Sequence, residues 1–330
     1  MAIKKVKQKL LELLADGSWV NGQRVADETG CSRTYIWKAV NSLRRDGFAI
    51  ESAQNRGYRL EKGADVMSEE LIRRFLPAGM KDINIVLRDT LGSTNDLGRL
   101  FAESGCPDWT VVIAREQTAG RGRFDRRFFS PAGTGLYMSV VLRPAIAAKD
   151  SVLLTAAAAV AVAKTLEKVC RIKTGIKWVN DVYVNGKKVC GILAESSVTP
   201  GAECPNYIVL GIGINLLPPK GGFPDELKDI AAAATDGEKK AVSCRVAAEL
   251  LARLKKYCEC LSYRGFYEDY EKRCFVIGRE IEFERGGRKI TATAERISKD
   301  FELVIRLPDG SRLALNSGEI IVKTVCNGNL

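Results

Sequence analysis

The sequence has 330 residues, of which 46% are hydrophobic and 28% charged, a balance typical of a globular protein with roughly two or three domains. Lys and Arg number 51 against 40 Asp and Glu, and the resulting net charge of +11 favours anionic partners. Histidine is absent, which excludes Ser-His-Asp and Cys-His nucleophiles, an imidazole base and His-ligated zinc.

The first 60 residues carry eleven Lys and Arg against six Asp and Glu. Apolar spacing predicts a helix at 10–14, a short helix over 23–28 and a longer one over 33–46, followed by a β-hairpin over 48–60. This is the order of a winged helix-turn-helix, whose second helix enters the major groove of DNA. The alternative is a solvated basic face on a packing domain, but motif order and charge both favour DNA. The candidate DNA contacts are Arg33, Thr34, Lys38, Asn41, Arg45, Arg56 and Arg59.

After this region the pattern changes to strands alternating with helices, which indicates a mixed α/β (α+β) protein. Short strands and turns beyond residue 271 predict a small all-β module. We therefore expect a DNA-binding domain over 1–62, a linker and helix over 63–82, a catalytic domain over 83–272 and a C-terminal domain over 273–330. The expected helices are 68–75, 95–103, 151–170 and 243–263, and the expected strands are 83–88, 110–115, 136–142, 176–178, 181–184, 188–196 and 207–216.

The longest apolar stretch, residues 152–163, is well short of the roughly 20 residues that cross a bilayer. The N-terminus has charge but no apolar core of a signal peptide. We expect a cytoplasmic protein with no membrane partner.

Four polar segments in the central block are candidates for chemistry. Residues 92–95 follow a strand and open a helix, although an N-cap alone would explain them. Residues 116–127 combine two glycines with several arginines, which suits an anion-binding loop more than a plain surface loop. In 177–181 a Lys and an Asp stand four apart, as a surface ion pair or as groups that meet a nucleotide. In 211–215 two glycines and an Asn share one strand face, where a flat ligand or another element could pack.

Together these segments resemble the biotin protein ligases. The motifs Gly-Ser-Thr-Asn (92–95), Gly-Arg-Gly-Arg (120–123), Lys-Trp-Val-Asn-Asp (177–181), Gly-Ile-Leu (191–193) and Gly-Ile-Gly-Ile-Asn (211–215) appear in that family's order and spacing. With the winged helix, the whole chain is similar to ligases that are also biotin operon repressors. Two positions depart from the family pattern, since Val179 replaces a usual proline and Asp125 a usual glycine.

The resemblance implies a central mixed-sheet domain akin to class II aminoacyl-tRNA synthetases and a C-terminal SH3-like β-barrel. It implies that biotin and Mg-ATP form biotinyl-5′-AMP, that biotin passes to a lysine of a biotin carboxyl carrier protein, and that the liganded protein dimerises on operator DNA. No bound prosthetic group is expected. Histidine is not needed, because forming the mixed anhydride calls chiefly for positioned cations.

The resemblance also assigns roles to residues, and some residues have more than one. The catalytic candidates are Lys177, Arg121 and Arg123, and Asp181 is a candidate Mg²⁺ contact. The nucleotide side would include Arg121, Arg123, Arg126, Phe128 as an adenine-stacking ring, Asn180 and Asn215, with Phe223 in a covering loop over 218–229. The biotin side would comprise Ser93, Thr94, Asn95, Gln117, Gly120, Arg121, Gly122, Arg123, Lys177, Gly191, Gly211 and Gly213.

Two alternatives stay open. A repressor whose catalysis has decayed is one, although Lys177, Arg121 and Arg123 are all present. A lipoate-type ligase, or an unrelated metabolite-sensing winged-helix regulator, is the other. By resemblance, the arginine loop and the Gly-x-Gly-x-Asn strand favour biotin.

Overall fold

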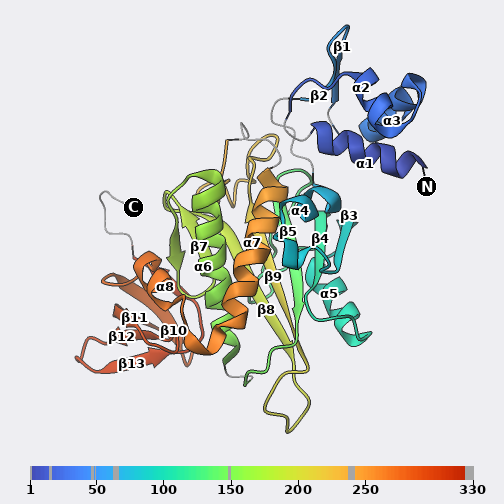
Figure 1. Cartoon of the computed structure of the whole chain (residues 1–330). Helices are drawn as coiled ribbons and strands as arrows, with labels where there is room; N and C mark the ends of the chain where they lie inside the picture. Colours follow the sequence, from blue (N-terminus) through green and yellow to red (C-terminus); the bar gives the residue numbers. More distant parts are fainter. Residues whose placement is uncertain are drawn as a thin grey trace.

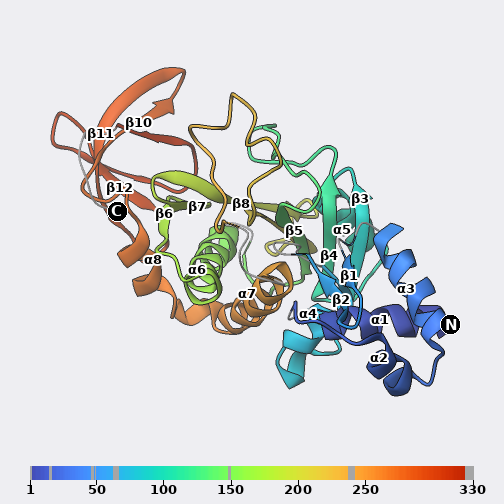
Figure 2. The same ribbon diagram turned by 90° about the horizontal axis from the view of Figure 1, so that it is seen from above.

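The structure, a computed structural model, describes residues 2–14, 17–45, 48, 50–61, 67–147, 150–236 and 242–323. An N-terminal domain of three helices and a hairpin, a central sheet with helices, and a C-terminal β module follow one another in the chain (Figure 1). The first and last of these lie at opposite ends of the central domain, as the view from above also shows (Figure 2). Residues 62–66, which include the start of the predicted linker and helix over 63–82, lie outside the described residues.

The N-terminal domain has the predicted winged-helix order. Its core is a set of fully buried apolar residues spaced one helical turn apart, such as Leu10 and Leu14 in the first helix and Ile36 and Val40 in the third. The first helix is longer than expected, and the last residue predicted for the third, 46, lies outside the described residues. The elements are α1 (Ala2–Leu14), α2 (Gly22–Thr29), α3 (Arg33–Arg45), β1 (Ile50–Ala53) and β2 (Gly57–Leu60).

A short helix, α4 (Glu69–Phe75), leads into the central domain and is followed by the 3₁₀ turn η1 (Ala78–Met80). The Ser68 side chain caps α4 by accepting from the Leu71 amide, and the helix itself matches the one expected over 68–75. Arg115 of the central sheet donates to the Met67 carbonyl and lies 5.4 Å from the centre of the Phe48 ring. One arginine therefore touches the segments on both sides of the linker.

The central domain is a seven-stranded sheet in the order β3-β4-β5-β9-β8-β7-β6, in which only β3 and β4 run parallel. The predicted strands are all present, with ends that differ by one or two residues in most cases. They are β3 (Ile85–Leu91), β4 (Thr110–Gln117), β5 (Gly135–Leu142), β6 (Gly175–Lys177), β7 (Asp181–Val184), β8 (Lys187–Ser197) and β9 (Tyr207–Asn215).

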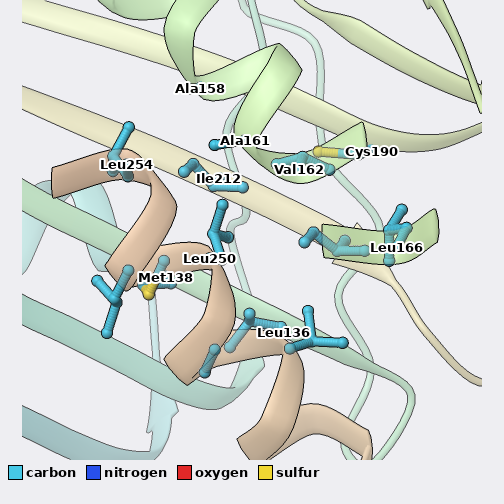
Figure 3. Close-up of a cluster of buried hydrophobic side chains, with 14 of the residues drawn as sticks. Leu136, Met138, Ala158, Ala161, Val162, Leu166, Cys190, Ile212, Leu250 and Leu254 are labelled. Carbon is cyan, nitrogen blue, oxygen red and sulfur yellow. The ribbon is translucent and has the colours of Figure 1, made fainter. Parts of the chain in front are cut away.

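The two faces of this sheet have different uses, because alternate residues of each strand point to opposite sides. Leu136, Met138 and Ile212 pack against α6 (Ser151–Cys170) and α7 (Val242–Glu259), with Leu250 among the α7 contacts (Figure 3). The intervening residues of the same strands face α5 (Thr94–Glu103), where Val141 and Val209 form a separate small core. Both glycines of β9 lie on this second face, Gly211 beside Asn95 at the N-terminus of α5 and Gly213 beside the Phe128 ring.

The C-terminal module is a five-stranded antiparallel sheet in the order β13-β12-β11-β10-β14. The chain reaches it through two elements that the sequence did not predict, η3 (Leu261–Tyr263), where the expected helix 243–263 has already ended, and α8 (Tyr267–Arg273). Phe301 stacks on Phe266 and fixes the module against these helices. Its strands are β10 (Glu280–Arg285), β11 (Arg288–Ile297), β12 (Leu303–Arg306), β13 (Arg312–Leu315) and β14 (Ile320–Val322).

No helix in the described parts of the chain combines the length and apolar character needed to cross a bilayer.

Candidate active site

The N-terminus of α5 and the end of β4 form one polar wall. Ser93 caps the helix by accepting from the Asn95 amide, so its hydroxyl has the N-cap role that the sequence left as the simpler explanation. The Gln117 side-chain oxygen accepts from the Thr94 amide at 2.8 Å and from its hydroxyl at 3.1 Å. The other end of the Gln117 amide donates to Ser130. These contacts fix the orientation of the Gln117 side-chain amide.

Asn95 is held from both ends of its amide. Its Oδ1 accepts from the Ser139 hydroxyl at 2.6 Å, and its Nδ2 donates to Glu195 Oε2 at 2.6 Å. The side chain lies on the bare backbone of Gly211, where an added Cβ would stand 2.2 Å from Asn95 Oδ1. Gly211 is therefore required by the close approach of Asn95.

The loop between β4 and β5 carries the arginines. Arg121 donates to Asp96 Oδ1 at 2.8 Å and to Glu195 Oε1 at 2.7 Å, so its charge is matched by two carboxylates. The hydrogen bond to Asp96 and the charges of Glu195 and Asp96 raise the pKa of Arg121 against the opposing effect of burial. Gly120 holds the base of the loop, because a Cβ there would lie 2.4 Å from the Phe128 carbonyl oxygen.

Arg123 and Arg126 connect the loop to the C-terminal module. Arg123 donates to Asn180 Oδ1 at 3.0 Å and to the Gly318 carbonyl at 3.1 Å, both neutral acceptors, and burial lowers its pKa. Arg126 donates with both terminal nitrogens to Glu319, at 2.5 and 2.7 Å. Residues close to the C-terminus thus close one side of the site.

Lys177 ends β6 and points into the same space. Burial lowers its pKa, while the negative charges of Asp181 and Glu319 partly oppose that effect. The sequence left open an ion pair between Lys177 and Asp181. This pair is not formed, because Asp181 Oδ1 lies 2.8 Å from Lys188 Nζ instead. Within the described chain, Lys177 has no carboxylate at ion-pair distance, and its side chain lines the cavity.

Asp181 is the candidate Mg²⁺ contact, and its Oδ1 lies 2.8 Å from the Lys188 ammonium as an ion pair without hydrogen-bond geometry. No group of three Asp, Glu or Cys side chains with metal-site geometry occurs among the described residues. Mg²⁺ bound to ATP needs only one or two protein carboxylates, so the assignment of Asp181 stays a prediction.

Aromatic rings cover the glycine floor. The Phe128 ring lies directly over Gly213, where a Cβ would come within 2.6 Å of it, and next to Gly191. Phe129, which the sequence did not single out, faces Phe223 with ring centres 6.4 Å apart. Phe223, from the predicted covering loop, therefore lies beside Phe129 in this part of the site.

All these groups surround one cavity of about 380 Å³. Of the predicted ligand residues only Gly120 lies outside its lining. The sequence missed Tyr137, Phe129, Gly318 and Glu319 in the lining, and Ser139, Asp96 and Glu195 behind it. The predicted residues that line the cavity are Ser93, Thr94, Asn95, Gln117, Arg121, Gly122, Arg123, Arg126, Phe128, Lys177, Asn180, Asp181, Gly191, Gly211, Gly213 and Asn215.

The candidate DNA-binding face is on α3. Arg33, Thr34 and Lys38 are exposed on it, and Trp37 between them, which the sequence did not predict, is 55% exposed. Asn41 is half-buried and accepts from Arg44. The side chain of the predicted Arg45 lies outside the described residues.

The two hairpin arginines differ. Arg56 is exposed, 6.0 Å from the centre of the Trp19 ring. Arg59 pairs with Glu51 at 2.5 Å and lies 4.7 Å from the same ring, so part of its charge serves the hairpin itself. Arg44, in turn, ties α3 to the hairpin through the Ile50 carbonyl.

Comparisons with known proteins cover all three parts of the chain. Residues 89–215 match the biotin/lipoate A/B protein ligase family, residues 6–59 an HTH domain, and residues 276–323 the biotin protein ligase C-terminal domain. The bifunctional ligase/repressor BirA of Bacillus subtilis is 40% identical over 71% of this chain and 73% of its own length. A biotin--[acetyl-CoA-carboxylase] ligase of Mycobacterium tuberculosis is 30% identical over 74% of this chain and 90% of its own. Among solved structures, the Aquifex aeolicus biotin protein ligase in complex with biotin and ATP superposes with a TM-score of 0.62 at 27% identity, over 73% of this chain and 99% of that one.

Proposed function

The chain belongs to the family of bifunctional biotin ligases and repressors, and from this premise we propose how its residues perform both activities. As a member, it is an ATP-dependent biotin–protein ligase with a DNA-binding repressor domain. Biotin and ATP are its substrates, as they are the ligands of the related Aquifex structure. The residue roles, Mg²⁺, the dimer and the division of the chain at residues 62, 82 and 272 are our proposals.

The reaction has two steps. A biotin carboxylate oxygen attacks the α-phosphorus of Mg-ATP, which gives biotinyl-5′-AMP and releases pyrophosphate. The ε-amine of a carrier lysine then attacks the biotinyl carbon, and AMP leaves. The first step brings a negatively charged carboxylate close to a negatively charged phosphate, and the second develops negative charge on the carbonyl and leaving-group oxygens. Positioned cations stabilise the charge in both steps.

One observation carries the assignment: Lys177 and Arg123, which have no carboxylate at ion-pair distance among the described residues, face the same cavity as the oriented amides of Asn95 and Gln117. A cavity of this kind can take a polar, uncharged ring at the amide end and an acyl phosphate at the cation end. We assign the ureido ring of biotin to the α5 end, and its carboxylate with the α-phosphate to Lys177 and Arg123.

The adenine ring fits the aromatic side of the cavity. Phe129 and Phe223 present two rings that a flat base can contact. Phe128 covers Gly213 and lies next to Gly191, so we propose it as a wall between the two substrates in place of the adenine-stacking role that the resemblance implies. Arg126 and Asn180 complete the nucleotide side, and Asp181 faces the phosphates and their Mg²⁺.

Repression requires two recognition helices on one operator. A two-fold dimer would present α3 from each protomer to two half-sites about one helical turn apart. We propose that biotinyl-AMP strengthens this dimer, a coupling that must be reciprocal. Sedimentation velocity with and without the adenylate tests it, and equal dimerisation in both would contradict it.

The decisive experiment for ligation is incubation of the full chain with biotin, Mg-ATP and a biotin carboxyl carrier domain, followed by intact mass measurement. We expect one biotinyl increment on the carrier, none on a carrier with its acceptor lysine replaced by arginine, and none without ATP. A carrier that stays unmodified under all conditions would reject the ligase. Lipoate offered in place of biotin should give no increment.

A further inference from the structure

We propose that Glu195 is a positioning residue for biotin and its adenylate. Its carboxylate joins the loop between β4 and β5, which carries Arg121, to the polar wall that contains Asn95. We call this connection the Glu195 strut. The proposal rests on the proposed function and deepens it. Glu195 is not in the cavity lining, and no sequence motif singled it out.

The position of Glu195 follows from strand geometry. Gly191, Leu193 and Glu195 alternate along β8 and so share one face. The first two line the cavity, and Glu195 stands just beyond its biotin end. On the neighbouring strand Leu193 is opposite Gly211, which places the carboxylate beside the Asn95 side chain that lies on Gly211.

Each oxygen of this carboxylate has a different task. Oε2 accepts from Asn95 Nδ2 at 2.6 Å, and Oε1 accepts from Arg121 Nη2 at 2.7 Å. Asn95 is in the wall and Arg121 is in the loop between β4 and β5, so one side chain joins two parts that both line the cavity. Hydrogen bonds to a charged partner are shorter and stronger than neutral ones.

The charges explain why a carboxylate can stand at a site for anions. Arg121 lies between Glu195 and Asp96, and these two carboxylates leave it no unmatched positive charge for a phosphate. Arg121 therefore closes the loop, whereas Lys177 and Arg123 meet the phosphate. Glu195 also fixes which end of the Asn95 amide donates, with Ser139 fixing the other end.

Glu195→Gln is the sharpest test, because it keeps the shape and removes one acceptor. A glutamine can accept from Asn95 or from Arg121, but its NH₂ then faces the other partner's N–H groups. We expect the Kd for biotin and the release rate of biotinyl-AMP to rise about tenfold, as for loss of a hydrogen bond to a charged group. The kcat of carrier biotinylation at saturating biotin should change less than the KM for biotin.

Two further variants make the test specific. Arg121→Ala should reproduce the faster adenylate release, and the double variant should be no worse than the more severe single one, because both remove the same strut. The loop should also be cut faster by trypsin after its arginines. The matched control is Glu295→Gln, since Glu295 likewise joins two arginines, Arg306 and Arg312, but in the C-terminal sheet.

The outcomes separate the proposals. If wild-type protein makes no biotinyl-AMP, the proposed function fails. If wild type is active and Glu195→Gln binds biotin and retains the adenylate within twofold of wild type, the strut is wrong while the ligase stands. Additive losses in the double variant would also overturn it. If the Tm of Glu195→Gln lies well below that of the Glu295→Gln control, the substitution has destabilised the fold. The rate of adenylate release from Arg121→Ala, a substitution on a surface loop, then decides the result: an unchanged rate would overturn the proposal.

Discussion

Gly211 gives the most direct test of the cavity floor. In Gly211→Ala the new methyl group would lie 2.2 Å from Asn95 Oδ1 and 2.9 Å from its Cγ, whereas ordinary contact begins at 3.4 Å. Asn95 must therefore move by about 1.2 Å or the strand must give way. Such a movement stretches the two 2.6 Å hydrogen bonds of its amide, to Ser139 and Glu195, beyond the usual range.

The cost can be estimated from these two contacts. A neutral hydrogen bond contributes about 1 kcal/mol and one to a charged group about 1.5–3 kcal/mol, which together give about 2.5–4 kcal/mol. Part of this lowers the stability of the ligand-free protein and part falls on biotin binding. We expect Tm to fall by a few degrees and the Kd for biotin to rise at least about tenfold, since each 1.4 kcal/mol is tenfold.

Isothermal titration of biotin into the full chain, with thermal unfolding of the same sample, measures both parts. Gly265→Ala is the matched control, because nothing lies within 4 Å of the Cβ it would add. A folded Gly211→Ala protein that binds biotin within twofold of wild type would refute the close approach of Asn95 and the amide end of the cavity as the biotin site.

Three other predictions concern charge. Burial lowers the pKa of Lys177, so the rate of pyrophosphate release should fall as the pH rises through that lowered pKa and the ammonium is lost. Lys177→Arg should keep its rate at high pH, because a guanidinium stays charged there. Identical pH profiles for the wild type and the variant would contradict this role of Lys177. Arg126→Ala and Glu319→Gln should each raise the KM for ATP severalfold and leave biotin binding without ATP unchanged. An equal loss of biotin affinity would contradict the assignment of this ion pair to the nucleotide side of the cavity. Arg33→Ala with Lys38→Ala should weaken operator binding at least tenfold and lower the salt slope by about two, with ligation intact; a band-shift series in salt checks it, and an unchanged slope would remove both residues from the DNA face.

The fold was largely predictable, because most of its elements have strong local signals. Ser32 and Ser68 mark helix starts, and alternation marks strands such as 136–142. The helix α8, which the sequence did not predict, is seven residues long and begins directly after a turn, so it is too short for a helical apolar period to be recognised. The helix expected over 243–263 ends early in η3, where the chain tightens before the C-terminal module.

The site was predictable only where residues cluster in motifs. Glu195 and Glu319 are single carboxylates in ordinary strand or turn surroundings, and their partners lie 100 and 193 residues away in sequence. Nor does spacing reveal that Lys188 pairs with Asp181, since an irregularity in the β7–β8 register sets that contact. Asp125, where the family pattern has glycine, adopts the left-handed φ of 56° that a glycine would favour.

The lengths of chain between contacting residues bear on biosynthesis. The elements of the winged helix contact one another within the first 60 residues, with a further contact from α1 to α4, so these elements are complete in sequence long before translation ends. The catalytic cavity needs Glu319, which leaves the ribosome 193 residues after its partner Arg126. A nascent or truncated chain therefore possesses a DNA-binding fold before it possesses a closed ligase site, and a stop codon shortly before residue 318 would separate the two activities.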